Sequence, residues 1–585
     1  MDQTDKLIGD QRIPLKQFFK KCWSFFKPIS KYFIFAIIFI IINVGFDIIL
    51  PLFIEKIVDG LSINTQESVK TIIYLTVAYL GITLFNQIFR FVEAYLLAKA
   101  GNKVVYDMRV QTFEHIEKMS LDQFEVMPVG SLLTRVCSYT NQMSELFTNQ
   151  LINLLRNAFM IIGVLAIMIV KNPKLSMIIL GFAVVVFLIS ILFRKIVSKL
   201  ARAEKGALSD LNTIISEDLN GMKIIQLFSK EQKASDDFRK VNKQFSSIRF
   251  KIMMSFSFYR PLITFIQYAA IAVVFVCGLK FNMEAGLIVA FYLFIEKFFE
   301  PVQQISDQLV HIERSISSSE RLFNLLDVRP AVIDKPEAKN IEKFNGKIEF
   351  RHVWFSYDNK NWVLKDVSFV INKGETCAFV GATGAGKTTI LSLLVKSYAP
   401  QKGQILIDDV DITDIKVSSL RSGIGQMLQD VFLFSGTIKD NVTLFDEKFS
   451  DEDINSALSY VNADIFVNQL ENKMNTQIVE RGENFSAGQR QLLSFARTIL
   501  HKPQILLLDE ATANIDTETE ILIQDSLDKI KSLGTMLVVA HRLSTIKNAD
   551  QIICLKNGVV AERGTHTELL KQKGYYYKLN ELQFK

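Results

Sequence analysis

Six long apolar stretches dominate this sequence and constrain its fold more than any other feature. They lie near residues 32–54, 71–97, 151–170, 175–196, 259–280 and 286–308. At about 1.5 Å of rise per residue, a helix made from each stretch is long enough to cross the hydrocarbon core of a bilayer. The composition agrees, because 49% of all residues are hydrophobic and the mean hydropathy is +0.22. The sequence therefore predicts a membrane domain of six transmembrane helices.

Basic residues predict which loops face the cytoplasm. Lys and Arg gather before the first apolar stretch and again after the fourth, whereas the loops at 55–70, 171–174 and 281–285 hold few. Basic residues favour the cytoplasmic side of a membrane. We therefore expect the N-terminus and the long loops at 98–150 and 197–258 in the cytoplasm, with both loops continuing the spans as helices.

The composition divides the chain into four parts. Residues 1–31 contain "KQFFKKCWSFFK", which is typical of an amphipathic helix on the cytoplasmic membrane surface. Residues 32–320 hold the six spans and their two long loops, and residues 321–346, with two prolines, are expected to form a linker. Residues 347–585 alternate short β-rich runs with helical ones. We therefore expect a helical membrane domain fused to an α/β domain.

A glycine-rich loop lies between an apolar strand and an apolar helix in "TCAFVGATGAGKTTILSLLV". Gly381, Gly386, Lys387 and Thr388 have the spacing GxxxxGK[ST]. In such a loop the glycines let backbone N–H groups approach phosphate oxygens, the lysine neutralises phosphate charge and the hydroxyl can bind Mg²⁺. The pattern predicts a P-loop that binds a phosphate together with Mg²⁺.

Two further apolar strands end in residues that suit phosphate chemistry. "ILLLDE" ends in Asp509 and Glu510, and "MLVVAHRL" continues into His541. Ligands in α/β folds bind at the carboxyl ends of parallel strands, where these side chains would meet. We expect Asp509 to hold Mg²⁺ through water, Glu510 to orient or deprotonate an attacking water, and His541 to reach the terminal phosphate.

Together these segments resemble the ATP-binding cassette transporters, over essentially the whole chain. "GATGAGKTT" is similar to the Walker A motif, "ILLLDE" to Walker B, "MLQD" to the Q-loop, "FSAGQ" to the signature and "ANID" to the D-loop, in the family's order. The membrane half resembles the exporter type. The resemblance implies an ATPase coupled to transport, with ATP and Mg²⁺ as cofactors. It also implies a multi-pass protein of the cell membrane whose cassette is cytoplasmic, and no nucleic-acid partner is expected.

The resemblance also implies roles for single residues. Glu510, His541 and Gln429 would be catalytic, and Thr388, Gln429 and Asp509 would hold Mg²⁺. The residues expected to bind ATP are the aromatic residue that stacks on adenine, the Walker A loop, the signature and the D-loop aspartate: Tyr357, Gly381, Ala382, Thr383, Gly384, Ala385, Gly386, Lys387, Thr388, Thr389, Ser486, Gly488, Gln489 and Asp516.

The signature raises the question of a partner chain. In this family two cassettes bind head to tail, so the signature of one covers the ATP that the other holds. This chain has one membrane half and one cassette, which implies half a transporter, and Ser486 would then contact the partner's ATP. Phe485 and Ala487 stand where the common motif has Leu and Gly. Either the change is neutral, or this signature covers a partner site that barely hydrolyses ATP, as in bacterial heterodimeric exporters.

Two classes of function remain, and a third is disfavoured. The favoured one is ATP-driven export of amphipathic small molecules, either drugs or lipid-like compounds, by alternating access, as half of a heterodimer with a related chain whose ATP site is degenerate. The alternative is a homodimeric lipid flippase. A non-transport ATPase or an importer subunit is disfavoured because the six spans are fused to the cassette.

Candidates for the substrate path lie within the apolar stretches. An aromatic group surrounds Glu296 and Lys297 in the sixth stretch, and other charged residues interrupt earlier ones: Phe291, Tyr292, Phe294, Phe298, Phe299, Asp47, Glu93 and Arg156. Charges inside a membrane are costly and often functional, whereas aromatic residues more often pack against helices and lipid. Because neighbours on a helix point in different directions, Glu296 and Lys297 need not pair. An aromatic cavity with one carboxylate would suit amphipathic or cationic drugs, and a basic rim would suit lipid headgroups.

Overall fold

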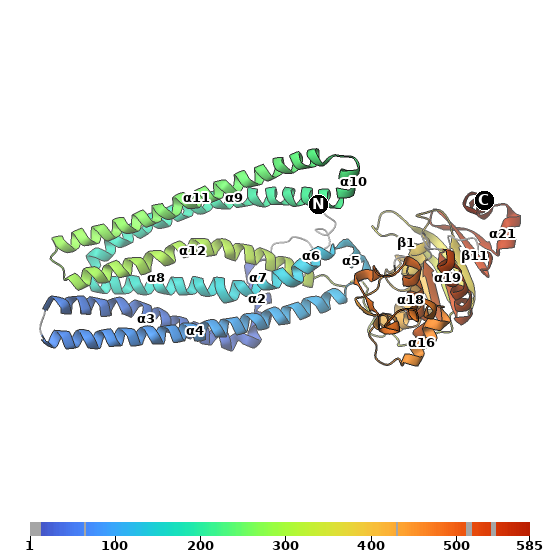
Figure 1. Ribbon diagram of the computed structural model, residues 1–585, viewed down its shortest axis with the longest axis horizontal. Coiled ribbons are helices and arrows are strands. Elements are labelled where there is room, and N and C mark those ends of the chain that lie inside the picture. The colour runs from blue at the N-terminus through green and yellow to red at the C-terminus, as the bar shows by residue number, and fades with distance from the viewer. Residues whose placement is uncertain are drawn as a thin grey trace. The chain divides into compact units, whose positions relative to one another are not determined.

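The chain folds into two compact units (Figure 1). The computed structural model describes residues 13–63, 66–330, 332–428, 431–509, 517–539 and 546–584. The first unit extends to Val328 and leaves out Lys118–Val126, and that segment joins the residues from Arg329 onward in the second unit. Among the described residues, the first unit contains helices only and the second contains all the strands.

Long helices build the first unit (Figure 1): α3 (Ser30–Ile63), α4 (Gln66–Glu117), α8 (Leu151–Lys171), α9 (Pro173–Asn220), α11 (Glu231–Lys280) and α12 (Ala285–Leu326). Shorter helical segments connect them: α6 (Val129–Leu133), η2 (Thr134–Tyr139), α7 (Thr140–Glu145), η3 (Leu146–Gln150) and α10 (Met222–Leu227). As expected for the two long loops, α4, α9 and α11 continue as helices well beyond the apolar stretches.

Five helical stretches among the described residues are long and apolar enough to cross a membrane: Leu15–Leu61, Gln66–Glu117, Val129–Lys171, Pro173–Asn220 and Glu231–Lys280. The sixth predicted span lies in α12, which is one continuous helix. Its apolar half carries Glu296, Lys297 and Glu300, so by composition it falls short of the other five. The structure thus agrees with an exporter-type helical domain whose sixth helix carries three charged residues in its apolar half.

The turn between α8 and α9 shows how the sequence separates two spans. Asn172 has an extended backbone, and its side-chain carbonyl accepts a hydrogen bond from the N–H of Leu175 at 3.2 Å. Pro173 occupies the first position of α9, where its missing N–H has no helical partner to lose. Asparagine as N-cap followed by proline therefore ends one helix and starts the next within a single residue.

The aromatic residues of α12 form part of the helical core. Phe291, Phe294 and Phe298 follow helical spacing and are buried against residues of α3, α8, α9 and α11. Tyr292 points elsewhere, and its hydroxyl donates to Glu296 at 2.9 Å on the exposed side of the helix. The phenylalanines predicted around the charges of the sixth stretch therefore pack between helices, whereas Tyr292 is only partly buried and bonds Glu296.

The N-terminal helix α2 (Leu15–Phe26) is amphipathic, as the sequence predicts. Phe18, Cys22 and Phe26 recur every fourth residue and are buried, whereas most of the intervening positions are exposed. The buried face contacts residues of α4 and α12, including Phe323. One face of α2 is thus covered by protein, and residues such as Trp23 on the other face are exposed.

The helix α12 extends further than the predicted linker allows. The linker was expected at 321–346, but α12 ends only at Leu326. Leu322, Phe323 and Leu325 are buried, so packing holds this last turn in helical form. The proline-containing part after Val328 belongs to the second unit.

The second unit is built on two sheets. The larger has the order β12-β11-β3-β10-β9-β6 and is parallel except for β12: β3 (Thr376–Val380), β6 (Ile424–Met427), β9 (Ile505–Asp509), β10 (Thr535–Val539), β11 (Gln551–Lys556) and β12 (Val559–Gly564). The smaller is antiparallel, in the order β2-β1-β4-β5: β1 (Ile348–Phe355), β2 (Leu364–Ile371), β4 (Lys402–Ile407) and β5 (Val410–Asp411). A short pair joins β7 (Gly436–Thr437) to β8 (Gln477–Ile478).

The larger sheet is buried on both faces. Leu506 and Leu508 of β9 face one apolar core, and Ile505 and Leu507 face the other. The helices of this unit are α5 (Leu121–Val126), α13 (Lys387–Leu394), α14 (Val417–Ser422), α15 (Ile438–Thr443), α16 (Asp451–Tyr460), α17 (Asp464–Val467), α18 (Ala487–Leu500), α19 (Thr517–Ile530), α21 (His566–Gln572) and α22 (Tyr575–Phe584). Burial on both sides explains the continuous apolar runs of its strands, which are typical of a parallel sheet covered by helices.

Candidate functional site

Three neighbouring strands of the larger sheet end at one edge. Val539 of β10 pairs with Phe379 of β3 on one side and with Asp509 of β9 on the other. Because all three strands are parallel, the loops that follow them leave the sheet together. The glycine-rich loop after β3 therefore begins at the same sheet edge as Asp509, which ends β9, with β10 between the two strands.

Two glycines of this loop have conformations and surroundings that exclude a side chain. Gly386 has φ +100°, and a Cβ atom there would lie 2.6 Å from Leu364 Cδ2. At Gly381 a Cβ atom would lie 2.3 Å from the carbonyl oxygen of Leu555. Gly384 differs, since its φ of +80° needs glycine although a Cβ atom would meet open space. The loop is thus packed at both ends and open in the middle.

Lys387 spans this loop from the first position of α13. Its Nζ donates to the carbonyl oxygens of Gly381 at 2.8 Å and Ala382 at 3.2 Å. Burial lowers the pKa of Lys387, and the nearby charge of Asp509 partly opposes that shift. The ammonium therefore lies inside the loop, close enough to the carboxylate at the end of β9 to interact with its charge.

The remaining loop residues divide into exposed and buried ones. Ala382, Thr383 and Thr388 are exposed, whereas Ala385 and Thr389 are buried. The N–H groups in the first turn of α13 have no carbonyl partner four residues earlier, and such groups bind anions well. An open loop centre, a helix start, one ammonium and an exposed hydroxyl make a donor set that fits a phosphate group with its Mg²⁺.

Tyr357 lies against the same loop. Its hydroxyl and that of Thr389 are 3.0 Å apart, and its ring meets the rings of Phe355 and Tyr398 edge to face. The side chain of Tyr357 is nevertheless exposed, at 53% of its surface. The ring is therefore held in place beside the start of α13 while about half of the residue's surface is exposed.

The signature segment begins α18 and has a structural role of its own. The Ser486 hydroxyl accepts the backbone N–H of Gln489 at 3.2 Å, and the Gln489 side-chain carbonyl accepts the N–H of Ser486 at 3.0 Å. This reciprocal pair is a capping box, and it stabilises the start of the helix. Gly488 is buried in the first turn. The same residues that are predicted to contact ATP thus also begin this helix.

The two departures from the common signature lie in different surroundings. Phe485 is buried in the core of the second unit, with its ring 6.2 Å from that of Phe466. Ala487 is exposed at the first position of α18. Phe485 is therefore a packing residue, and only Ala487 changes the surface that the signature presents.

Four predicted site residues, Gln429, Glu510, Asp516 and His541, lie outside the described residues. The structure does describe two polar residues, one in α15 and one in α18, that the sequence analysis missed. Asn441 is fully buried and bonds both the N–H and the C=O of Phe434, and the Arg497 guanidinium donates to the Asn441 carbonyl at 2.8 Å. Burial lowers the pKa of Arg497. Polar residues inside the apolar patterns of α15 and α18 were the signal that could have revealed them.

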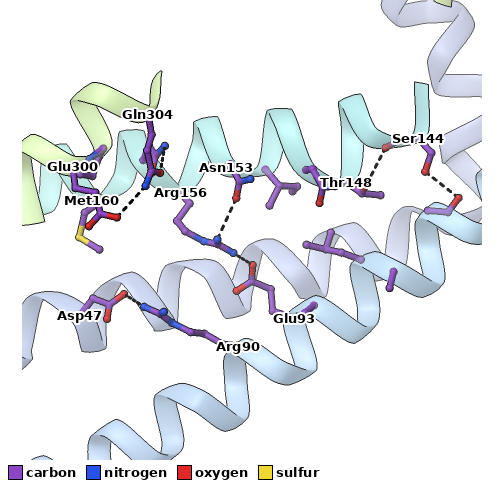
Figure 2. Close-up of a pocket in the computed structure, with 18 of the residues that line it drawn as sticks. Asp47, Arg90, Glu93, Ser144, Thr148, Asn153, Arg156, Met160, Glu300 and Gln304 are labelled. Atoms are coloured by element: carbon purple, nitrogen blue, oxygen red, sulfur yellow. Dashed lines mark hydrogen bonds and ion pairs between the residues drawn. The ribbon is translucent and has the colours of Figure 1, made fainter. Parts of the chain in front are cut away.

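The first unit contains a cavity with a volume of about 700 Å³ (Figure 2). It is bordered by α3, α4, α7, η3, α8 and α12. Four of the charged residues predicted for a substrate path line it together: Asp47, Glu93, Arg156 and Lys297. Glu296 does not line it, and Lys297 pairs with Asp47 at 3.8 Å, as expected for two neighbours that point in different directions.

Comparisons with known families cover both units. Residues 33–302 match the family described as "ABC transporter transmembrane region", and residues 364–513 match the one described as "ABC transporter". A "Putative ABC transporter ATP-binding protein exp8" of Streptococcus pneumoniae is 35% identical over 571 residues, which cover 96% of this chain and 97% of that protein.

Two other relatives carry functional names. A "Probable multidrug resistance ABC transporter ATP-binding/permease protein YheH" of Bacillus subtilis is 36% identical, over 88% of this chain and 78% of that protein. An "ATP-dependent lipid A-core flippase" of Syntrophus aciditrophicus is 30% identical, over 99% and 96%.

A solved structure supports the fold. The chain is similar to a bacterial Atm1-family ABC exporter with ATP bound, with a TM-score of 0.81 over 95% of this chain and 99% of that one, at 23% identity. The two family matches agree with the fold. They cover most of the long helical region, the P-loop between β3 and α13 and the capped signature helix. This chain belongs to the ABC transporter family, as an exporter-type half-transporter that hydrolyses ATP to drive transport across a membrane.

Proposed function

We propose that this chain exports amphipathic small molecules, either drugs or lipid-like compounds, by alternating access. The observation that carries the proposal is the cavity within the helical unit, on the same chain as the P-loop cassette. It is lined by both charged and apolar side chains, which suits a molecule with a polar and an apolar part. The names of two relatives, a multidrug resistance transporter and a lipid A-core flippase, point to the same class of cargo.

ATP would be handled at the edge of the larger sheet. The exposed start of α13 and the ammonium of Lys387 would bind the phosphates, and Tyr357 would stack on adenine. Mg²⁺ would be held by Thr388, by Gln429 and, through water, by Asp509, and it would neutralise phosphate charge during hydrolysis.

Hydrolysis itself requires residues that follow β9 and β10. Glu510 would orient or deprotonate the attacking water, and His541 would contact the terminal phosphate. Gly381 to Thr389 would surround the phosphates of ATP, and Asp516 would join the D-loop contact with the partner cassette. The cassette and the N-terminus would lie in the cytoplasm, because basic residues gather at the same ends of the spans.

We propose further that the partner is a related but distinct chain with a degenerate ATP site. Ser486, Gly488 and Gln489 would lie over the partner's ATP. Ala487 supports this because it is exposed at the start of α18, where its methyl group limits how closely the backbone can approach a phosphate. An altered signature costs little turnover when the site beneath it contributes little hydrolysis.

Purification from the native membrane tests the partner directly. Mass spectrometry of the intact complex should find two related chains in equal amounts. The Glu510→Gln variant should stop nearly all ATP turnover, because this chain would hold the hydrolysing Walker B site. Ala487→Gly should leave turnover within about twofold, since it acts over the other site.

The homodimeric lipid flippase is the second candidate, and the similarity to a lipid A-core flippase over 99% of this chain favours it. In that case mass spectrometry would find one species. Both sites would be equivalent, each with Ala487 over the terminal phosphate, and Ala487→Gly would raise turnover at both. A single species whose ATPase rate rises in this variant would overturn the heterodimer.

A further inference from the structure

The cavity of the first unit contains two charge clusters that bridge its helices (Figure 2). In one, the Arg90 guanidinium lies 2.6 Å from Asp47, which links α4 to α3. In the other, the Arg156 guanidinium contacts Glu93, which links α8 to α4. Lys297 of α12 adds a third cation, 3.8 Å from Asp47. Four helices therefore contribute charge to a single cavity.

The carboxylates of both clusters are already bonded on each oxygen. Asp47 accepts Arg90 on one oxygen and the Asn86 amide on the other, at 3.0 Å. Glu93 accepts Arg156 on one oxygen and the Asn43 amide on the other, at 2.8 Å. Only 10% of the Asp47 side chain and 2% of the Glu93 side chain are exposed. Neither carboxylate has much surface left for a ligand.

The three cations, unlike the carboxylates, are partly exposed. The side chains of Arg90, Arg156 and Lys297 are exposed at 49%, 39% and 30% of their surface. A guanidinium has five N–H donors, and the contacts with carboxylate and amide use only some of those on Arg90 and Arg156. The buried acids thus fix three cations in place, while donors of those cations face the cavity.

The remaining residues of the cavity lining determine which ligands the three cations can bind. Glu300 is the remaining carboxylate of the lining, and it accepts the side-chain amide of Gln304 at 3.0 Å. Small and apolar residues continue along α4 and α8 from the charged clusters, and they include Ala94, Leu97, Ala98, Ile152 and Met160. The cavity therefore has exposed cations next to apolar residues, with Asn153 between those of α8 and Asn149 just before this helix.

We infer that this cavity binds amphipathic molecules through an anionic headgroup, with the phosphate or carboxylate on Arg90, Arg156 and Lys297 and the apolar body along α4 and α8. Guanidinium groups match the planar geometry of such oxyanions and bind them with charge-assisted hydrogen bonds. The inference rests on the proposed export function and names its cargo class. A cationic headgroup would meet one exposed carboxylate, Glu300, against three exposed cations, because Asp47 and Glu93 are buried and already bonded.

A matched set of probes tests the charge preference. 1-Pyrenebutyrate, 1-pyrenebutanol and the corresponding trimethylammonium derivative share one apolar body and differ in headgroup. Binding is measured by probe fluorescence on the full-length transporter, with any chain that copurifies, in nanodiscs of a zwitterionic lipid, with empty nanodiscs subtracted. The carboxylate probe should bind about tenfold more tightly than the alcohol, as expected for charge-assisted hydrogen bonds. Equal or tighter binding of the ammonium probe would overturn the inference.

Lys297→Gln is the sharpest variant, because Asp47 keeps its contacts with Arg90 and Asn86. It should weaken the carboxylate probe about tenfold and leave the alcohol probe unchanged. The paired change Glu93→Gln with Arg156→Gln removes the second cluster without leaving a buried charge unpaired, and it should act in the same way. Arg202→Gln, on an exposed position of α9 outside the cavity, is the matched control and should change neither probe. An unchanged carboxylate affinity in both cavity variants would refute the assignment.

Two further outcomes separate the possible failures. If none of the probes binds or changes the ATPase rate of the reconstituted transporter, the export of amphipathic cargo fails together with the inference. If the alcohol and ammonium probes bind and are transported as well as the carboxylate, export stands and only the headgroup preference is wrong. Sodium butyrate carries the carboxylate without the pyrene body. Displacement of the probe by butyrate at equal concentration would assign the site to free anions instead of amphiphiles.

Discussion

Substituting Ser486 with aspartate separates the two roles of the signature serine. In the structure the Ser486 hydroxyl caps α18 by accepting the Gln489 N–H at 3.2 Å. Aspartate is as good an N-cap as serine, and its negative charge at a helix start is favourable by about 0.3–1 kcal/mol. Ser486→Asp should therefore leave the stability of the cassette unchanged or slightly raised, whereas Ser486→Ala should cost about 1 kcal/mol through the lost cap.

The effect on ATP handling should be the reverse. If Ser486 contacts the phosphate of ATP on the partner chain, the new carboxylate meets a like charge. Two unit charges at about 4 Å interact by about 4 kcal/mol at an effective dielectric constant near 20. Because both ATP sites form when the two cassettes close, even a partly screened repulsion at this signature would slow closure, and with it turnover at the hydrolysing site, by about 100-fold or more.

Thermal unfolding and steady-state ATPase activity of the purified transporter measure the two effects side by side. Ser486→Asp should unfold at or above the wild-type temperature and lose nearly all ATPase activity, and Ser486→Thr, which keeps both the cap and the hydroxyl, should retain both properties. An aspartate variant that hydrolyses ATP at the wild-type rate would show that this serine only begins a helix.

Three further substitutions probe the cassette. Lys387→Ala should weaken ATP binding about tenfold or more, because it removes a charge-assisted phosphate contact. Lys373 is exposed, so Lys373→Ala is the control and should leave ATP binding unchanged. Equal ATP affinity in the two variants would contradict the role of Lys387. Tyr357→Ala should raise the ATP concentration for half-maximal turnover about tenfold by removing a stacking surface. Tyr357→Phe keeps the ring and loses the hydroxyl that contacts Thr389, so it should act weakly. An unchanged ATP requirement in the alanine variant would place adenine elsewhere. In chemical denaturation, Phe485→Ala should destabilise the cassette by about 3 kcal/mol or more, and Phe485→Leu by less than about 1.5 kcal/mol. A similar loss of stability in both variants would show that burial of the ring is not what matters.

The long-range organisation of the chain was predictable because its signals are long and repeated. Apolar runs of about 20 residues and a glycine-rich loop between strand and helix depend only on neighbouring residues. The linker was predicted to begin at residue 321, but α12 continues to Leu326. Leu322 and Phe323 continue the helix through packing against other elements, which no local pattern reports.

The cavity was harder to predict because it depends on contacts between residues that are far apart in the sequence. The charges Asp47, Glu93 and Arg156 were noted in the sequence, but their partners lie on other helices, 43 residues away for Asp47 with Arg90 and 63 for Glu93 with Arg156. For the aromatic residues of α12, the sequence allowed either a cavity wall or packing, because their spacing is also that of a buried helix face. The capping box at Ser486 had a local signal, the S-x-x-Q pattern, that was read only as part of a phosphate contact.

ATP-driven accumulation of an amphipathic probe tests the account most directly. The complete transporter is reconstituted into liposomes, and ATP with Mg²⁺ is added outside, so that only cassettes facing outward are energised. The account predicts that 1-pyrenebutyrate accumulates inside only with ATP and that Glu510→Gln abolishes the accumulation while ATP still binds. A transporter that hydrolyses ATP without moving any amphipathic probe, or that accumulates the probe equally well with Glu510→Gln, would contradict it.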